Sequence, residues 1–491
     1  MAEINVVTDL GADNTGNTDA SGVIQSSINN DKDGENHNKG INTYIFPPGT
    51  YRFDNYLTPK PGQKFKGSDP TDKPTIKTDG VPYAFFLPSN EYSGEYSGCE
   101  FRSLKFREVD RTSSAPSVAI QIEDRDNVLI EDCKAIGYTQ YGFVIQAVTR
   151  SIVNPRMIGN TVKKHAESGS DIAIGLLVDS PIDPVTYDSN GGVVAGNRVF
   201  LSEETTADGV CCKIENFRNI TVQDNTFHRG NIQTGSNSAA LTLIGLRNST
   251  VKNNTITSLV DTPRLAAVTI TSSQDAGGSR YTLDVLFLNN VLNGNTTPGL
   301  ETGALLLNGD LRNVRIIDNE INAQLEYNYT DGSAPTMASN IALLTISANE
   351  IGTYFKCTSN KIDNMTLSGN TIEQHLKMIP DASAPSVSIT NVNIDNSNTI
   401  NLSSGEPIHL EAPNTSFDDN IVTVDAAGYQ TNHLVRIAAD YVSVTNNNFI
   451  GSGTNQNIQC LVSLESGITG WSVNGNQKSG SISGVDDLCS S

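Results

Sequence analysis

The sequence predicts an all-β protein, a single-stranded right-handed parallel β-helix (a solenoid) with a short N-terminal capping helix. Three observations predict it: an N-terminal stretch of distinct character, a short motif that recurs along the chain, and a second apolar segment in each repeat. The chain has 491 residues, and its length alone would suggest about three domains. A repeat can use the same length as one elongated fold, because each coil stacks on the next.

Composition excludes several classes of protein. The chain carries 33 Lys and Arg against 54 Asp and Glu, a formal net charge of −21, so we expect no nucleic-acid partner. No apolar run approaches the ~18 residues of a membrane span, so we expect no membrane insertion. Residues 1–5 have neither a basic nor an apolar region, and we therefore expect no Sec-type signal peptide. The chain is expected to be soluble, and either intracellular or released by a route other than simple secretion.

The N-terminal stretch, residues 6–67, predicts a cap. Thr18 or Asp19 can N-cap a short helix whose apolar Val23, Ile24 and Ile28 face one way. Such a helix can plug the open end of a β-helix, where unpaired strand edges and core side chains would otherwise meet water. We therefore divide the chain into a cap with the first coil at 1–67, a β-helix at 68–480 and a C-terminal tail at 481–491.

The recurring motif is aliphatic-x-x-Asn-x-apolar. From Asn197 to Asn370, successive motif Asn residues are 21 to 36 residues apart, usually 28 or 29. A corner between strands needs left-handed backbone, which Asn tolerates, and stacked Asn side chains can hydrogen-bond from coil to coil. We expect these Asn to be structural rather than ligand-binding; they are Asn197, Asn225, Asn254, Asn290, Asn319, Asn349, Asn370, Asn447 and Asn476.

Each repeat also carries an apolar segment about 15 residues before its Asn. These segments are short, rich in aliphatic residues and bounded by turn formers, as strands are; they include 142–145, 172–178, 209–214, 239–244, 265–270 and 303–307. The short strands of one coil cannot bury a face alone, but stacked coils share one core and pair every strand above and below. The absence of an LxxLxL pattern excludes leucine-rich repeats, and the absence of a 3.6-residue period excludes helical repeats.

The seven cysteines form no CxxC pair and have no His at zinc-finger spacing, which argues against a metal site of that kind. An odd, scattered set is typical of buried thiols rather than a disulfide framework. Cys460 and Cys489 are the pair to check for a disulfide.

Three N-terminal segments follow one another in the chain: GADNTGNTD at 11–19, IQSSI at 24–28 and FPPGTYR at 46–52. This order resembles the N-terminal cap of the pectate-lyase-like β-helix superfamily, which many phage tailspikes, polysaccharide depolymerases and glycan-cleaving enzymes carry. The resemblance implies an elongated β-helix, often a homotrimer, that acts on a polysaccharide as part of a virion tail or outside the cell. It specifies the fold rather than the reaction, because one fold hosts many chemistries.

Catalytic motifs of the superfamily are missing. There is no Asp-Asp pair followed by Gly-His-Gly and Arg-x-Lys, as in polygalacturonases, and no Asp-Pro-His-Glu, as in mannuronan epimerases. We interpret the chain as a tailspike-type depolymerase, and favour glycoside hydrolysis over elimination because a charge of −21 would repel a uronate-rich polymer. The alternatives are a non-catalytic receptor-binding or structural spike, and a cellular polysaccharide lyase or epimerase.

Charged residues gather in three consecutive loops, 163–171, 203–208 and 228–236. Loops that leave the same corner of a β-helix stack about 4.8 Å apart per coil, so we expect these side chains on one flank. Paired carboxylates there would suit a glycosidase, and a His or Lys base beside an Arg would suit a lyase. The catalytic candidates are Asp208 with Glu203 or Glu204, followed by His228, Arg229 and His165; the substrate-binding candidates are Lys163, Lys164, Glu167 and Asp171. The alternative is that all of them are solvated loop charges.

Other segments offer weaker candidates. Tyr327 and Tyr329 lie in a long insertion and could stack on sugars, although an ordinary exposed loop is the alternative. The charged run 123–126 is interpreted as a surface turn. No cofactor is required by this interpretation; Asp and Asn along the coils could hold calcium, but no EF-hand-like spacing supports such a site.

Overall fold

A computed structural model gives the structure of this chain. It describes residues 2–92, 94–109, 117–164, 171–178, 189–201, 209–230, 239–258, 266–272, 274–275, 278–279, 282–294, 303–327, 341–358, 361–380, 388–402, 406–425, 429, 431–455 and 457–490. The chain divides into two compact units, Met1–Leu265 (unit 1) and Ala266–Ser491 (unit 2), each of which we describe by itself.

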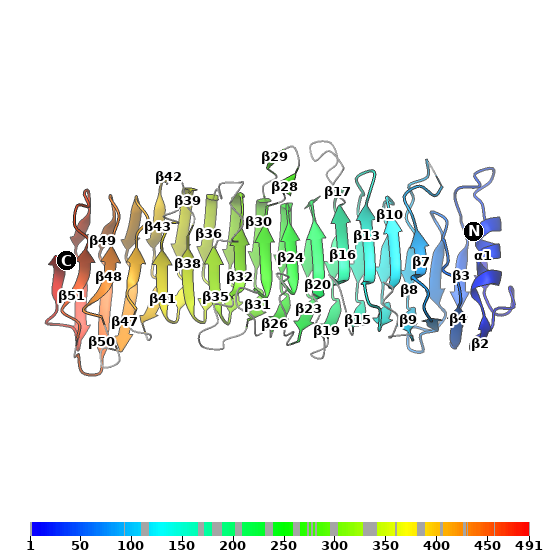
Figure 1. The fold of residues 1–491 in the computed structure, drawn as a ribbon, viewed down its shortest axis with the longest axis horizontal. Helices are drawn as coiled ribbons and strands as arrows, with labels where there is room; N and C mark the ends of the chain where they lie inside the picture. The colour runs from blue at the N-terminus through cyan, green and yellow to red at the C-terminus, as the bar shows by residue number, and fades with distance from the viewer. Residues whose placement is uncertain are drawn as a thin grey trace. The chain divides into compact units, whose positions relative to one another are not determined.

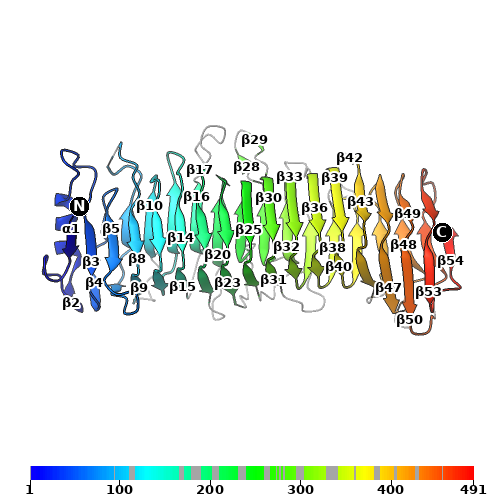
Figure 2. The same cartoon turned by 180° about the vertical axis from the view of Figure 1, so that it is seen from behind.

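Unit 1 consists of three parallel sheets, to which successive coils contribute strands in turn (Figures 1 and 2). Sheet A contains β1 (Glu3–Asn5), β3 (Thr43–Phe46), β5 (Lys64–Gly67), β8 (Glu100–Arg102), β11 (Leu129–Glu131), β14 (Arg156–Ile158), β17 (Ser189–Asn190), β18 (Val193–Ala195), β21 (Phe217–Arg218), β22 (Thr221–Gln223) and β25 (Arg247–Lys252). Sheet B contains β2 (Thr15–Asp19), β4 (Thr50–Phe53), β6 (Thr75–Thr78), β9 (Lys105–Glu108), β12 (Lys134–Ile136), β15 (Thr161–Lys164), β19 (Arg198–Leu201), β23 (Thr226–Arg229) and β26 (Thr255–Ser258). Sheet C contains β7 (Tyr83–Leu87), β10 (Val118–Glu123), β13 (Tyr141–Ala147), β16 (Asp171–Val178), β20 (Gly209–Glu215) and β24 (Leu241–Ile244).

Unit 2 repeats the same plan. Its sheet A contains β30 (Thr282–Leu288), β33 (Leu311–Ile317), β36 (Ile341–Ser347), β39 (Lys361–Ser368), β42 (Ser388–Ile389), β43 (Val392–Asp395), β46 (Thr415–Asp418), β49 (Ser443–Thr445) and β52 (Ser472–Asn474). Sheet B contains β31 (Val291–Asn293), β34 (Glu320–Ile321), β37 (Glu350–Ile351), β40 (Thr371–Ile372), β44 (Thr399–Leu402), β47 (Ile421–Asp425), β50 (Asn448–Ser452) and β53 (Gln477–Gly480). Sheet C contains β27 (Val268–Thr271), β32 (Gly303–Asn308), β35 (Gln324–Tyr327), β38 (Tyr354–Cys357), β41 (His375–Met378), β45 (Ile408–Leu410), β48 (His433–Ile437), β51 (Cys460–Leu464) and β54 (Asp486–Ser490).

The predicted right-handed parallel β-helix is confirmed in both units. The apolar segments of the sequence form sheet C, and the strands on either side of the motif Asn form sheets A and B. One short antiparallel pair, β28 (Gln274–Asp275) with β29 (Gly278–Ser279), departs from the parallel pattern. The segment predicted as a C-terminal tail contains β54, which pairs with β51.

The capping helix α1 (Ser21–Asn30) is present at the N-terminal end of unit 1 (Figure 1). Ile24 and Ile28 are fully buried as predicted, but Val23 is 42% exposed, because only residues three or four apart share a helix face. The predicted N-cap was also wrong, since Ala20 occupies that position. Asp19 ends strand β2, and from there its carboxylate accepts hydrogen bonds from the backbone N–H and the hydroxyl of Ser21 (2.9 and 2.6 Å).

The core of unit 1 is filled by side chains stacked in register from coil to coil. Tyr44, Phe65 and Phe101 pair across β3, β5 and β8, with ring centroids 5.2 and 5.4 Å apart and nearly parallel planes. All three side chains are fully buried, so the apolar area that they remove from water stabilises neighbouring coils together.

The Asn ladder is confirmed. In unit 1 the Nδ2 of Asn197 donates to the Oδ1 of Asn225 at 2.9 Å, and the Nδ2 of Asn225 to the Oδ1 of Asn254 at 2.8 Å. Each Oδ1 also accepts from the backbone N–H of the previous ladder Asn, which satisfies buried polar groups that would otherwise be costly. The same bonds connect the ladder residues of unit 2, and the structure adds Asn160, Asn398 and Asn420 to the set.

The expected backbone conformation of the ladder Asn was wrong by one residue. The left-handed conformation belongs to the residue immediately before it, such as Asp224 (φ 56°) and Asn253 (φ 55°). That residue turns the chain at the corner, and the ladder Asn that follows can therefore aim its amide into the stack.

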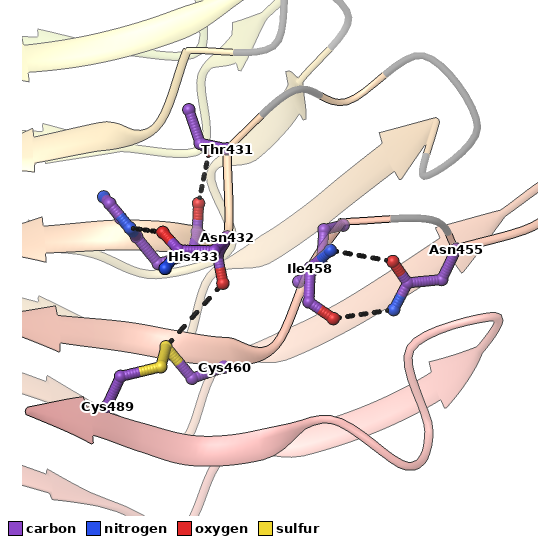
Figure 3. Close-up of a disulfide and its surroundings, with 7 residues drawn as sticks. All are labelled: Thr431, Asn432, His433, Asn455, Ile458, Cys460 and Cys489. Carbon is purple, nitrogen blue, oxygen red and sulfur yellow. Dashed lines mark hydrogen bonds between the residues drawn. A yellow bond between two sulfur atoms is a disulfide. The ribbon is translucent and has the colours of Figure 1, made fainter.

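A disulfide joins Cys460 in β51 to Cys489 in β54, and Figure 3 shows it close to β48 and its first residue, His433. The pair singled out from the sequence is therefore confirmed. The other five cysteines are buried thiols, as expected. Burial raises the pKa of the Cys99 and Cys133 thiols to about 12, which leaves both unreactive. Among the described residues, no helix has the length and hydropathy of a membrane span.

Candidate functional site

The strands that lead into the three predicted loops lie side by side. β15, β19 and β23 pair in parallel and place Lys163, Phe200 and His228 at matching positions, so the first residues assigned to two of the loops belong to strands. The Nζ of Lys163 lies 6.0 Å from the centroid of the Phe200 ring, and the ring centroids of Phe200 and His228 are 6.3 Å apart. The strands that lead into the loops are therefore neighbours, while the stacking of the loops and a catalytic role for this flank stay predictions.

Half of the predicted site residues lie outside the part of the chain that the structure describes: His165, Glu167, Glu203, Glu204, Asp208 and Tyr329. Lys164, Asp171 and Tyr327 are described only as members of β15, β16 and β35. Their roles remain predictions.

The predicted surface position of Arg229 is wrong. Its side chain is fully buried, as is that of Phe227 two residues earlier, whereas Thr226 and His228 are only partly buried. Side chains alternate between the two faces of a strand, so Arg229 shares the inner face with Phe227 and belongs to the core side of β23. It is not part of a surface cation cluster with Lys163.

The run 123–126 is also not an ordinary surface turn, because Asp124 and Arg125 are each only 1% exposed. The Asp124 carboxylate accepts hydrogen bonds from the backbone N–H of Val148 and Thr149, at 2.7 and 3.0 Å. The Arg125 guanidinium donates to backbone carbonyls, including that of Glu91 at 2.5 Å. These bonds compensate for burial of the charged groups, and the turn is a fixed structural element.

A different set of chemically active side chains gathers on sheet C of unit 2. Lys356, Lys377, His409 and Arg436 occupy matching register positions on the consecutive strands β38, β41, β45 and β48. We call these four residues the basic stripe. Because neighbouring strands are about 4.8 Å apart, the stripe presents one basic side chain per coil.

Among the described residues, three carboxylates contact the stripe. Glu406 lies 2.5 Å from the Nζ of Lys377, and Glu411 lies 3.0 Å from the Nδ1 of His409 and 3.5 Å from Arg436. Glu465 forms the closer ion pair with Arg436 and accepts a hydrogen bond from its Nε at 3.0 Å. The hydrogen bond from Lys377 holds the pKa of Glu406 below its usual value, and the bond from His409 does the same for the pKa of Glu411. Both carboxylates are therefore ionised at neutral pH.

His409 has the geometry of a general base. Its Nδ1 is engaged by Glu411, and within the described residues its Nε2 has no hydrogen-bond partner. A carboxylate at Nδ1 favours the tautomer with the proton on Nδ1, which leaves the Nε2 lone pair available to accept a proton. Lys377 and Arg436 flank it on the adjacent strands, Lys377 in an ion pair with Glu406 and Arg436 in ion pairs with Glu411 and Glu465.

Two further histidines belong to the same sheet. The His375 ring stacks on Tyr354 at a centroid distance of 4.7 Å, and its Nε2 lies 3.7 Å from Glu406. Burial, followed by the charge of Lys377, lowers the pKa of His375 to about 4, so this ring is neutral at pH 7. Burial also lowers the pKa of His433 on β48.

Sequence reasoning missed this cluster. Three of the six histidines of the chain fall here, in the patterns His375-x-Lys377, His409-x-Glu411 and His433-x-x-Arg436. They recur at roughly the coil interval and each pattern lies in or directly beside a sheet C strand, which is the signal that could have found them. Among the described residues, no group of three or more His, Cys, Asp or Glu is arranged to hold a metal ion.

No family model and no curated protein sequence matches the chain. Among solved structures, it is similar to a tailspike protein double mutant of the E. coli bacteriophage HK620 in complex with a pentasaccharide, at 12% identity and a TM-score of 0.51, over 94% of this chain and 78% of that one. It is also similar to the catalytic unit of a GH87 α-1,3-glucanase from Streptomyces thermodiastaticus (13%, TM-score 0.43, 99% and 69%). A third is the A-module of the mannuronan C-5 epimerase AlgE6 from Azotobacter vinelandii (14%, TM-score 0.37, 97% and 99%).

At these identities the similarity concerns the fold alone. The chain has the parallel β-helix fold of the HK620 tailspike, as its N-terminal motifs and Asn ladder indicated.

Proposed function

We propose that this protein binds and cleaves a polysaccharide, and that the basic stripe of unit 2 is its reacting site. The observation that carries the proposal is the His409–Glu411 pair set between Lys377 and Arg436 on three adjacent strands. The fold supports the substrate class, because the tailspike of similar fold was solved with a bound pentasaccharide.

The arrangement suits elimination from an acidic polysaccharide. Lys377 and Arg436 would exchange the Glu406 and Glu465 carboxylates that they now pair with for the carboxylate of a uronic acid, and this acidifies the proton on the carbon beside it. His409 Nε2 would take that proton, and the C–H electrons would form a C=C bond as the neighbouring C–O bond to the next sugar breaks. The leaving oxygen takes a proton from solvent. Glu411 acts as a positioning residue that holds the His409 ring and its tautomer.

Hydrolysis needs a protonated acid near the leaving oxygen, and the two carboxylates nearest Lys377 and His409, those of Glu406 and Glu411, have lowered pKa values. The cluster therefore favours elimination, whereas the net charge of −21 favoured hydrolysis of a less acidic polymer. Hydrolysis remains the second candidate function, with Asp208 and Glu203 or Glu204 as its predicted residues.

The first test is product analysis by mass spectrometry after incubation with polygalacturonate, alginate, hyaluronan and neutral dextran. Elimination gives unsaturated oligosaccharides that are lighter by one water than the hydrolysis products. We expect H409A to lower kcat by at least 100-fold, the usual contribution of a general base. E411Q should lower kcat less and should change its pH profile, because it acts through His409.

The matched control is H37A, which removes an exposed histidine of unit 1 and should leave turnover unchanged. Unchanged kcat in H409A together with loss of activity in D208N would refute the unit 2 site and place the chemistry in the predicted loops. Retained binding without any product would instead mean a non-catalytic receptor-binding spike.

We further propose that the protein is a homotrimeric virion tail or extracellular component, supported by its similarity in fold to the HK620 tailspike. Sedimentation equilibrium tests the oligomeric state, and a monomer at micromolar concentration would contradict it.

A further inference from the structure

Three aromatic side chains form a small surface on sheet C of unit 1. Tyr83 and Phe86 stack on each other with ring centroids 4.3 Å apart and planes 13° apart. Tyr56 lies on the segment beside β7 and meets both rings edge-on, at 5.9 and 6.1 Å. Tyr56 is 43% exposed, and Tyr83 and Phe86 are partly buried. We call these three residues the aromatic platform.

A polar edge adjoins the platform on the next two strands. Gln121 on β10 is the register partner of Phe86, and Glu123 is the partner of Gln146 on β13. The Nε2 of Gln121 donates to Glu123 at 2.7 Å and lies 3.5 Å from the Oε1 of Gln146, while the other Glu123 oxygen accepts from the Ser89 N–H at 2.9 Å. These bonds hold the three polar side chains in place.

The held side chains still offer hydrogen-bonding groups. Within the described residues, no partner engages the Oε1 of Gln121, the Nε2 of Gln146 or the hydroxyls of Tyr56 and Tyr83. The edge therefore presents fixed acceptors and donors beside an apolar ring surface. A sugar needs this combination, because each hydroxyl both donates and accepts while the C–H face of the ring is apolar.

The charges near the platform select against an anion. Glu123 is the carboxylate in contact with the polar edge. Burial, followed by the charge of Glu123, raises the pKa of Tyr83. The two arginines of the neighbouring turn are engaged elsewhere, since Arg125 is buried against backbone carbonyls and Arg150 forms an ion pair with Asp126 at 2.9 Å. An acidic sugar would meet a carboxylate without a cation to balance it.

We propose that the aromatic platform is a second saccharide-binding site, one that takes a neutral pyranose. The sugar stacks on the platform rings, and Gln121 and Gln146 hydrogen-bond its hydroxyls. This inference deepens the proposed function: it rests on polysaccharide binding, and it makes the substrate a heteropolysaccharide with both neutral and acidic sugars. It does not depend on cleavage in unit 2.

The experiment is calorimetric titration of the full chain with neutral hexasaccharides (maltohexaose, cellohexaose and laminarihexaose). We expect at least one of them to bind, and Y56A to weaken that binding about tenfold, since a stacked ring contributes roughly this factor. Q146L keeps the rings and removes one hydrogen-bonding group, and should weaken binding severalfold. The matched control is Y441N, which removes an exposed aromatic ring of unit 2 at a left-handed position that Asn tolerates.

Binding that is equally strong in Y56A and the parent chain would overturn the platform, and so would the absence of binding to every hexasaccharide. Binding of a uronic acid oligomer that Y56A weakens would overturn the neutral assignment. The same titration in the H409A chain separates the two proposals: unaltered neutral-sugar binding there supports the platform even if no polysaccharide is ever cleaved. Circular dichroism of each variant checks that the fold is retained.

Discussion

Sheet C has the same parallel strand arrangement in unit 1 and in unit 2, but the side chains on its outer face differ in chemistry. In unit 1 the face around Tyr83 and Phe86 is aromatic and amide-rich, and in unit 2 the corresponding positions around His409 are basic and acidic. Within each unit, a ladder of buried Asn and the pairing of strands hold the coils together. Because inward side chains and backbone bonds carry the fold, outward residues can change chemistry from coil to coil at little cost in stability.

Among the described residues, only unit 2 contains a disulfide. Removing it should have the largest effect on stability that this comparison predicts. The disulfide closes a loop of 29 residues, and loss of the cross-link should cost unit 2 about 3 to 4 kcal/mol. C489S should lower the urea midpoint of the unit 2 transition, followed by fluorescence of Trp471, the single Trp of the chain. C133A, which alters a buried thiol of unit 1, should leave the Trp471 transition in place. Identical Trp471 midpoints for C489S and the parent would contradict a stabilising role for the disulfide.

Acid should also destabilise unit 2. The pKa of His375 is lowered from 6.5 to about 4 in the folded protein. Between these two pH values the histidine is protonated in the unfolded chain and neutral in the folded chain. Stability is then full above pH 6.5 and falls toward pH 4, by up to about 3 kcal/mol. Glu406 acts in the same direction because its pKa is lowered as well. We expect H375F, which retains a ring against Tyr354, to flatten the dependence of the Trp471 urea midpoint between pH 7 and 4.5.

The comparison with H375F isolates the histidine, since Glu406 titrates in both chains. A slope that is the same in H375F and the parent would mean that His375 is protonated at its ordinary pKa in the folded protein.

The smallest expected effect is that of salt. Raising NaCl from 50 to 500 mM should weaken binding of an acidic oligosaccharide to the basic stripe by roughly tenfold, because screening acts on charge pairs. Binding of a neutral hexasaccharide to the aromatic platform should change less than about twofold over the same range. Equal salt dependence for both ligands would remove the proposed division between a charged and a neutral site.

The fold was predictable in detail because its signals are local and repeated. The motif Asn, the apolar segments and the helix at Ile24 and Ile28 each follow from spacing within one coil. Where the predictions failed, a neighbouring residue took the expected role: Ala20 is the N-cap instead of Thr18 or Asp19, and Asp224 rather than Asn225 adopts the left-handed conformation. Such shifts of one residue depend on hydrogen bonds to other coils, which a single coil does not specify.

The candidate site was less accessible to sequence reasoning. Lys377, His409 and Arg436 are 27 to 32 residues apart in the chain and become neighbours only through strand register. Arg229 was assigned to the surface from its loop context, although strand alternation turns it inward. A charged residue in a repeat can face either way, and its register partners decide its chemistry.

The sequence by itself determined the repeat, the short strands of each coil and the ladder, because alternation and turn formers act over a few residues. Only the tertiary structure decided which outward side chains stand together on sheet C, because coil lengths vary and the register between coils depends on packing and on the ladder bonds.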